Sequence, residues 1–178
     1  FHDPDLACGD HVICEYWNAD LNRWTLVDPQ QDALHCALNQ LDFDPCDLPR
    51  DRFLSSGRAW LRCRTGEADP HDFGYSPDAR GWNVVRSYLV HDLAALNRME
   101  MLIQDGWGLA STREAGITED DVRLLDRVAA LIQHGEDGDT GVFHGARALY
   151  EANRRLRVPP VVTCMDIVRG SRRRVALT

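Results

Sequence analysis

The chain has 178 residues, 44% of them hydrophobic, which is enough for one compact domain with a buried core and a small appendage. Its 20 basic and 28 acidic residues give a net charge of −8, which argues against binding the phosphate backbone of nucleic acids. No apolar run approaches the roughly 20 residues that span a bilayer, and no secretory signal pattern opens the chain. We therefore expect a cytoplasmic protein whose partners include neither a membrane nor a nucleic acid.

The strongest strand pattern lies near the start of the chain. Residues 11–17 and 23–28 are rich in aromatic and β-branched side chains, and a turn-prone segment, 18–22, separates them. This pattern predicts a β-hairpin. A proline directly after the second strand is well placed to begin a short helix, which we expect over residues 29–39.

Apolar side chains at three- and four-residue steps predict that the rest of the chain is mainly helical. The expected elements are a helix from Asp47 to about Gly66, a loop over 67–80, a helix over 82–103, a helix from the Thr118/Asp121 capping box to His134 and Gly135, a turn over 135–139, a helix over about 140–157, and a tail with a basic run at 172–174.

The predicted hairpin brings a histidine close to an aspartate. Alternation places His11 and Trp17 on one face of the first strand. If a four-residue turn starts at Ala19, His11 is the diagonal neighbour of Asp28, and if it starts at Asn18, His11 lies directly opposite Asp28. Opposed residues are about 5 Å apart and diagonal ones about 7 to 8 Å apart, so either register lets the carboxylate approach the imidazole.

A histidine oriented by a carboxylate is two-thirds of a nucleophile triad, because the carboxylate fixes the tautomer while the other ring nitrogen exchanges a proton with a cysteine or serine. Each residue also has a simpler interpretation. His11 fits an ordinary strand histidine, and Asp28 fits a cap for the helix that begins at Pro29. The two roles of Asp28 are compatible with each other.

The hairpin has the form His-x-x-x-Glu-x-Trp, a short turn, and Trp-x-Leu-Val-Asp-Pro. This pattern resembles the histidine and aspartate strands of the transglutaminase-like superfamily of papain-like thiol enzymes. Stretches up to about residue 109 resemble an uncharacterised bacterial subfamily of it. These stretches are Leu41–Pro45, Leu48–Phe53, Gly57–Trp60, Gly66–Pro70 and Leu93–Asn97.

The resemblance implies an α+β fold with a transglutaminase-like, papain-type core, an antiparallel hairpin and a largely helical C-terminal half. Residues 1–109 would form the C-terminal part of that core, and residues 110–178 a helical extension. His11 would be the catalytic base and Asp28 its orienting partner. Trp17 shares a face with His11 and is a candidate wall of a substrate groove.

The implied activity is acyl transfer or hydrolysis at an amide or ester carbonyl through a cysteine acyl-enzyme, with a peptide, amide or small-molecule acyl substrate and neither cofactor nor metal. In this superfamily the nucleophilic cysteine precedes the histidine by some tens of residues, at the start of a buried helix. Only ten residues precede His11, so we expect the nucleophile to lie outside this chain. Cys8 is too close to the histidine strand to start a separate helix, and Cys14 lies on the opposite face from His11.

Two other interpretations follow from the same residues. A catalytically inactive relative would serve as a binding or scaffolding module, and an N-terminal fragment could complete the site as a separate chain. The six cysteines contain no Cys-x-x-Cys pair, so we expect free, mostly buried thiols rather than a zinc site or a disulfide framework.

Overall fold

A computed structural model describes residues 8–76, 78–99, 101–111, 117–136, 141–166 and 171–176. Its contacts divide the chain into two compact units. The smaller unit is Asp10–Ser55, and the larger comprises Phe1–Gly9 together with Ser56–Thr178. The described part mixes helices with small sheets, which confirms the expected α+β class at this level. None of its helices is both long and apolar enough to cross a bilayer.

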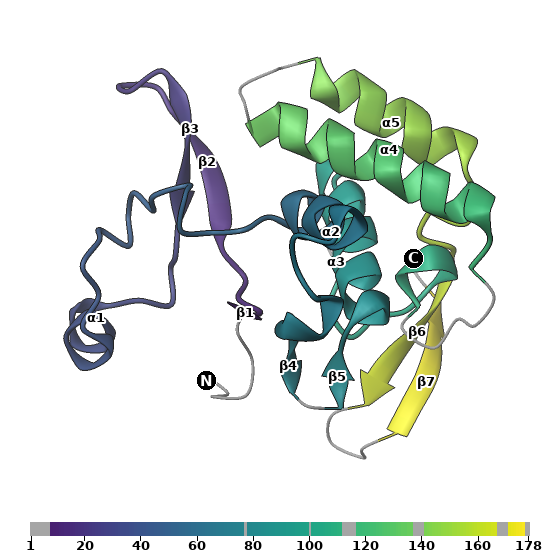
Figure 1. The fold of residues 1–178 in the computed structure, drawn as a ribbon, viewed down its shortest axis with the longest axis horizontal. Coiled ribbons are helices and arrows are strands. Elements are labelled where there is room, and N and C mark those ends of the chain that lie inside the picture. Colours follow the sequence, from purple (N-terminus) through teal and green to yellow (C-terminus); the bar gives the residue numbers. More distant parts are fainter. Residues whose placement is uncertain are drawn as a thin grey trace. The chain divides into compact units, whose positions relative to one another are not determined.

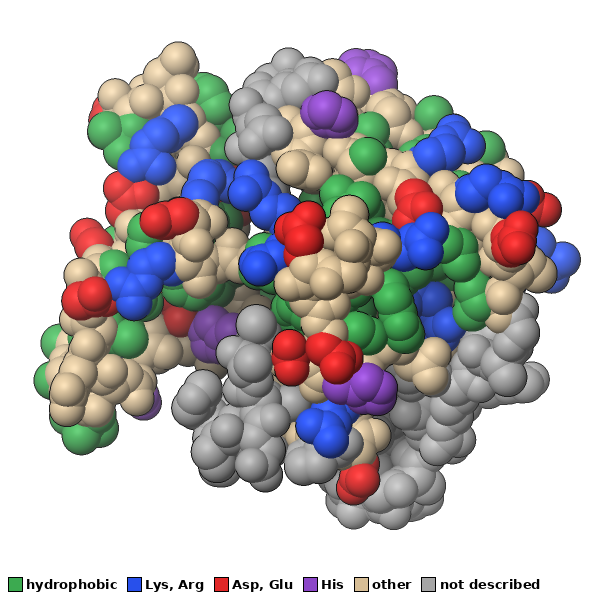
Figure 2. Space-filling view, in the orientation of Figure 1, with side chains coloured by type: hydrophobic (Ala, Val, Ile, Leu, Met, Phe, Trp, Pro, Cys, Tyr) green, Lys and Arg blue, Asp and Glu red, His purple; other side chains and the backbone are tan. Residues whose placement is uncertain are grey.

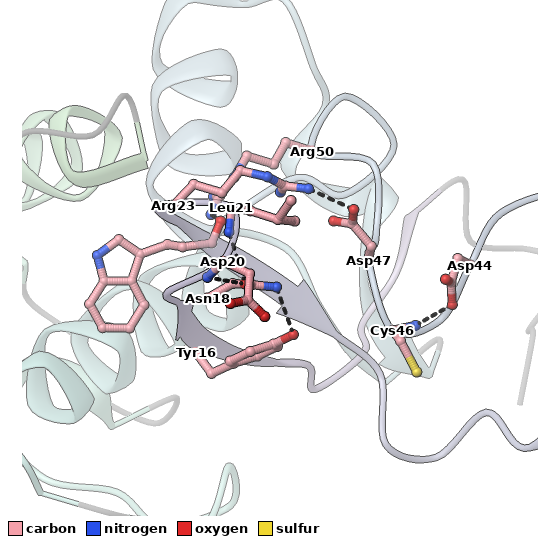
Figure 3. Close-up of polar contacts among 10 residues, drawn as sticks. Tyr16, Asn18, Asp20, Leu21, Arg23, Asp44, Cys46, Asp47 and Arg50 are labelled. Atoms are coloured by element: carbon pink, nitrogen blue, oxygen red, sulfur yellow. Dashed lines mark hydrogen bonds and ion pairs between the residues drawn. The ribbon is translucent and has the colours of Figure 1, made fainter.

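The predicted hairpin is present in the smaller unit, but its first strand begins at Cys14 rather than at His11. Strands β2 (Cys14–Asn18) and β3 (Arg23–Val27) pair in antiparallel fashion. The Asn18 side chain accepts hydrogen bonds from the backbone N–H groups of Asp20 and Leu21, both at 3.1 Å, and so closes the turn (Figure 3). An asparagine that binds the backbone two and three residues onward favours this local reversal of the chain.

Helix α1 (Ala33–Asn39) begins at residue 33, whereas the sequence predicted a start at residue 29. The difference arises because Asp32, and not Asp28, is the N-cap of the helix. The Asp32 carboxylate accepts a hydrogen bond of 2.8 Å from the backbone N–H of His35. Pro29 and Gln30 form a turn before it.

The prediction of a helix starting at Asp47 is wrong. Residues 47–55 form turns and irregular structure, and helix α2 begins only at Ser56. The preceding loop lies along β3 instead, with Asp28 N–H donating to the Pro45 carbonyl and Leu48 N–H to the Leu26 carbonyl. Pairing with a strand edge therefore takes the backbone groups that a helix would have used.

In the described part of the larger unit, four α-helices pack around one core (Figure 1). They are α2 (Ser56–Thr65), α3 (Trp82–Leu96), α4 (Glu119–Glu136) and α5 (Val142–Ala152). Helix α4 packs against α2 and α3, and α5 packs against α3 and α4. The side chains with the least exposure in this core include Leu89, Leu93, Leu109, Leu125, Val128 and Leu156. Helices on both sides of residue 109 thus share one core, and the family-based boundary at 109/110 stays a prediction.

Several element ends in this unit differ from expectation. The region expected to be a loop contains the 3-10 helix η1 (Pro70–Asp72) and the strands β4 (Phe73–Ser76) and β5 (Ala79–Arg80). These strands join β1 (Cys8–Gly9) in a sheet of order β1-β4-β5. Such short strands are specified by their partners rather than by a sequence pattern of their own.

Helices α3 and α5 are both shorter than predicted. Helix α3 ends at Leu96 rather than at 103, because the Asn97 and Met99 N–H groups close its last turn, and a second 3-10 helix, η2 (Gly108–Ala110), follows. Helix α5 ends at Ala152 since Asn153 adopts an extended backbone. The C-terminal segment is a hairpin of β6 (Val161–Asp166) and β7 (Ser171–Ala176) instead of a tail.

Ion pairs are spread along the outer surface of α4 and α5. Arg123 binds Asp120 at 2.5 Å and Glu119 at 3.5 Å, and Arg147 binds Glu151 at 2.8 Å. Figure 2 shows positively and negatively charged side chains lying beside one another on one face of the molecule. Exposed pairs of this kind contribute little to stability, roughly 0 to 1 kcal/mol each.

The capping box that opens α4 is confirmed. Asp121 accepts hydrogen bonds from the Thr118 N–H at 2.9 Å and hydroxyl at 2.7 Å, and from Arg155 at 2.5 Å. Burial raises the pKa of Asp121, but the hydrogen bonds from Thr118 and the Arg155 guanidinium outweigh burial and hold this pKa below its usual value. A carboxylate with a depressed pKa stabilises the fold above its unfolded-state pKa, and this contribution is lost as the pH falls through the folded-state pKa.

We therefore expect Asp121→Asn to destabilise the protein at pH 7 by about 1 to 2 kcal/mol, through the weakened cap and the lost charge. Urea unfolding at a series of pH values measures this. The difference between wild type and variant should shrink as the pH falls below about 4, because Asp121 in the unfolded chain then takes up a proton that folded Asp121 takes up only at lower pH. A difference that stays constant down to the acid-unfolding region would contradict the assignment.

Candidate functional site

The structure decides the register that the sequence left open. Trp17 lies opposite Trp24, which aligns Ile13 with Asp28 and confirms the turn that starts at Ala19. His11 is therefore the diagonal neighbour of Asp28. Its Nε2 atom lies 2.6 Å from Oδ2 of Asp28, so the predicted contact between the two side chains is confirmed.

Asp28 is buried and held in place from two sides. Its side chain is only 5% exposed, its second oxygen, Oδ1, accepts a hydrogen bond of 3.0 Å from Gln30 N–H, and its own N–H donates to the Pro45 carbonyl at 2.9 Å. Asp28 thus contacts the His11 ring and also accepts a hydrogen bond within the turn after β3. The carboxylate presents Oδ2 to the imidazole in one orientation, as an orienting partner requires.

The His11 ring keeps one nitrogen available. Its side chain is 37% exposed, and no described residue hydrogen-bonds Nδ1. With the Nε2 proton directed at Asp28, Nδ1 carries the lone pair in the neutral ring. The ring can therefore take a proton at Nδ1 while the Asp28 carboxylate stabilises the resulting imidazolium.

Further side chains follow on the same face of the hairpin. Glu15 forms an ion pair with Arg50, whose guanidinium also donates to the Trp24 carbonyl at 3.2 Å. Beyond it, Trp17 packs edge-to-face on Trp24, with ring centroids 5.8 Å apart, and is 47% exposed. Trp17 lies within β2, whereas His11 lies three residues before the start of this strand. The role of Trp17 in binding substrate stays a prediction.

The cysteines differ in part from expectation. Cys63 is buried and Cys36 is half-buried, but Cys14 and Cys46 are exposed, so the prediction of mostly buried thiols is wrong for these two. None of these four forms a disulfide bond. Cys14 is exposed because β2 pairs only with β3 and the rest of the described smaller unit leaves its face uncovered. The side chains of the remaining two cysteines, Cys8 and Cys164, lie outside the described residues.

None of the four described cysteine thiols hydrogen-bonds His11. Within the described ranges, no three His, Cys, Asp or Glu side chains are grouped so as to hold a metal ion.

The smaller unit contains a second histidine–aspartate pair that the sequence analysis did not single out. His35 Nδ1 lies 2.7 Å from Oδ1 of Asp32, and both side chains are more than half exposed. The backbone N–H of His35, and then its ring, lower the pKa of Asp32. The three-residue spacing at the start of a helix was the available signal, since an N-cap aspartate reaches the residue three positions on. This exposed pair is a matched control for His11 and Asp28.

No protein-family model, no curated protein and no solved structure matches this chain. The functional proposal therefore rests on the hairpin residues themselves and on the geometry of His11 and Asp28.

Proposed function

We propose that this chain carries the general base of a cysteine-dependent acyl transfer or hydrolysis at an amide or ester carbonyl, on a transglutaminase-like, papain-type scaffold. The observation that supports it most directly is the 2.6 Å contact between a half-exposed His11 and a buried, immobilised Asp28. The sequence pattern around the two residues resembles the histidine and aspartate strands of that superfamily. The nucleophilic cysteine lies outside the 178 residues in this proposal.

The reaction would proceed through two rounds of proton transfer at His11. In the first, Nδ1 takes the proton of the cysteine thiol while the sulfur attacks the carbonyl carbon, and the imidazolium then gives this proton to the leaving amine or alcohol. A thioester remains. Water or an amine then attacks the thioester and transfers its proton to Nδ1. The C–S bond breaks, and the imidazolium returns this proton to the departing thiolate, which regenerates the thiol. Throughout, Asp28 accepts the Nε2 hydrogen bond and stabilises each imidazolium.

The proposal is tested by thiol reactivity in the natural full-length protein that contains these residues. Iodoacetamide labelling at pH 6, followed by peptide mass spectrometry, should find one cysteine outside this chain that reacts faster than all others, because an imidazolium lowers the pKa of a neighbouring thiol. His11→Ala should slow this labelling about 10-fold or more.

His35→Ala removes an imidazole that also touches an aspartate, and it should leave the labelling rate unchanged. If no cysteine stands out in the wild type, or if both variants behave alike, the protein is not a thiol enzyme that uses His11. The inactive binding module would then be the better interpretation.

A further inference from the structure

His91 lies in the larger unit, in the second half of α3, with both ring nitrogens directed at backbone carbonyl groups. Nδ1 is 2.7 Å from the Ser87 carbonyl oxygen of the preceding helical turn, and Nε2 is 3.2 Å from the Leu102 carbonyl oxygen in the loop after the helix. The ring also contacts the Trp107 ring edge-on, with centroids 4.7 Å apart. The imidazole therefore joins the helix to the loop that leads into η2.

A neutral imidazole cannot donate to both carbonyl groups. It has one N–H, and its other nitrogen carries a lone pair, which a carbonyl oxygen repels. The Ser87 hydroxyl does not resolve this conflict, because it is 3.4 Å from Nδ1 and donates instead to the Ala110 carbonyl at 2.8 Å. The imidazolium form, with two N–H groups, donates to both oxygens.

The loop segment that His91 contacts contains a buried carboxylate, Asp105. Asp105 is 7% exposed, and its Oδ2 accepts from Leu102 N–H at 3.0 Å while its own N–H donates to the Leu102 carbonyl at 2.8 Å. Its Oδ1 is buried and has no hydrogen-bond partner among the described residues. A buried carboxylate favours a cation nearby, and the same Leu102 peptide group links Asp105 to the His91 ring.

The other charged groups on the neighbouring elements have partners of their own. Arg86 of α3 donates to the carbonyl groups of Leu109 and Ser111 at 2.9 and 2.5 Å. Asp92 accepts from the Ser56 hydroxyl of α2. Arg155, whose carbonyl group accepts from Leu109 N–H, binds Asp121. No described charged side chain hydrogen-bonds the His91 ring itself.

We propose that His91 is a pH-dependent clamp. When the ring is protonated, its two N–H groups hold the Leu102–Asp105 turn against α3. When the ring loses its proton, one of these two hydrogen bonds is lost and the turn opens more often.

Amide hydrogen exchange of Leu102 and Asp105 tests the clamp, because both amides donate hydrogen bonds within the turn. After correction for intrinsic exchange rates, protection in the wild type should fall about 10-fold between pH 5.5 and pH 8, the effect of losing one hydrogen bond to a charged group. In His91→Gln, protection of the two amides should not change with pH. His144→Gln, which alters an exposed histidine on α5, should keep the wild-type pH dependence.

A second measurement does not depend on a variant. In the wild type at pH 5.5, ring ¹H–¹⁵N spectra should show both His91 nitrogens protonated, with the N–H protons protected from solvent. Amide protection that does not change with pH, or unprotected ring protons, would overturn the proposal. A ring with its carbon atoms facing the two carbonyl groups would give that second result.

Discussion

Replacing Asp28 with asparagine is expected to slow ester turnover by the natural full-length protein about 1,000- to 10,000-fold. Gln30 N–H donates to Oδ1, so the asparagine oxygen would keep that position and its NH₂ group would face Nε2 of His11. Nε2 must then accept a hydrogen bond, which moves the ring proton to Nδ1. The nitrogen that should act as the base is thereby protonated in the neutral ring.

Hydrolysis of p-nitrophenyl acetate, corrected for the rate of a variant that lacks the fast-reacting cysteine, measures this effect. Asp32→Asn is the matched control, since Asp32 also touches a histidine but is exposed, and it should change the rate less than two-fold. If both variants lose the same fraction of the hydrolysis rate, the contact between Asp28 and His11 has no part in catalysis. Circular dichroism of both variants verifies that the fold is retained.

Gly108→Ala is expected to have the largest effect on stability, about 3 kcal/mol or more. The backbone at Gly108 has φ of +36°, and a β-carbon there would lie 2.1 Å from the Arg155 carbonyl oxygen. That oxygen accepts the Leu109 N–H at 2.9 Å, so it cannot move away without breaking a hydrogen bond of the core. The substitution therefore adds a steric clash to the cost of the backbone conformation.

Gly66→Ala separates these two costs. Gly66 also has a positive φ, +79°, but a β-carbon there would meet no atom within 4 Å. The Gly66→Ala variant should lose only about 1 kcal/mol of unfolding free energy, which is the cost of the left-handed backbone conformation. Urea unfolding of both variants at pH 7 measures the difference, and equal losses would contradict the close approach at Gly108.

Local sequence patterns correctly predicted the features that depend only on residues close together in the sequence. The hairpin pattern placed His11 near Asp28, and the Thr118/Asp121 capping box marked the start of α4 within one residue. Both are short-range effects, one of strand geometry and the other of an aspartate that binds the backbone three residues away. The exposed His35–Asp32 pair belongs to the same class and could have been found in this way.

Contacts between segments that are distant in the sequence decided the hairpin register and the start of α2. The sequence allowed two hairpin registers, and the pairing of Trp17 with Trp24 selected one of them. The helix expected from Asp47 is absent because the loop that contains it pairs with β3, more than 15 residues earlier in the chain. A helix pattern cannot report such a competitor, since the competing hydrogen bonds come from another element.

The sequence by itself thus determined the strand, the histidine and the carboxylate that could form a site. Only the tertiary structure decided that Asp28 is buried and fixed by the Pro45 carbonyl and Gln30 N–H, and that His91 meets a carbonyl oxygen of a loop 11 residues away. The physical reason is that side-chain type and spacing follow from the local sequence, whereas burial and hydrogen-bond partners depend on which distant groups the fold brings together.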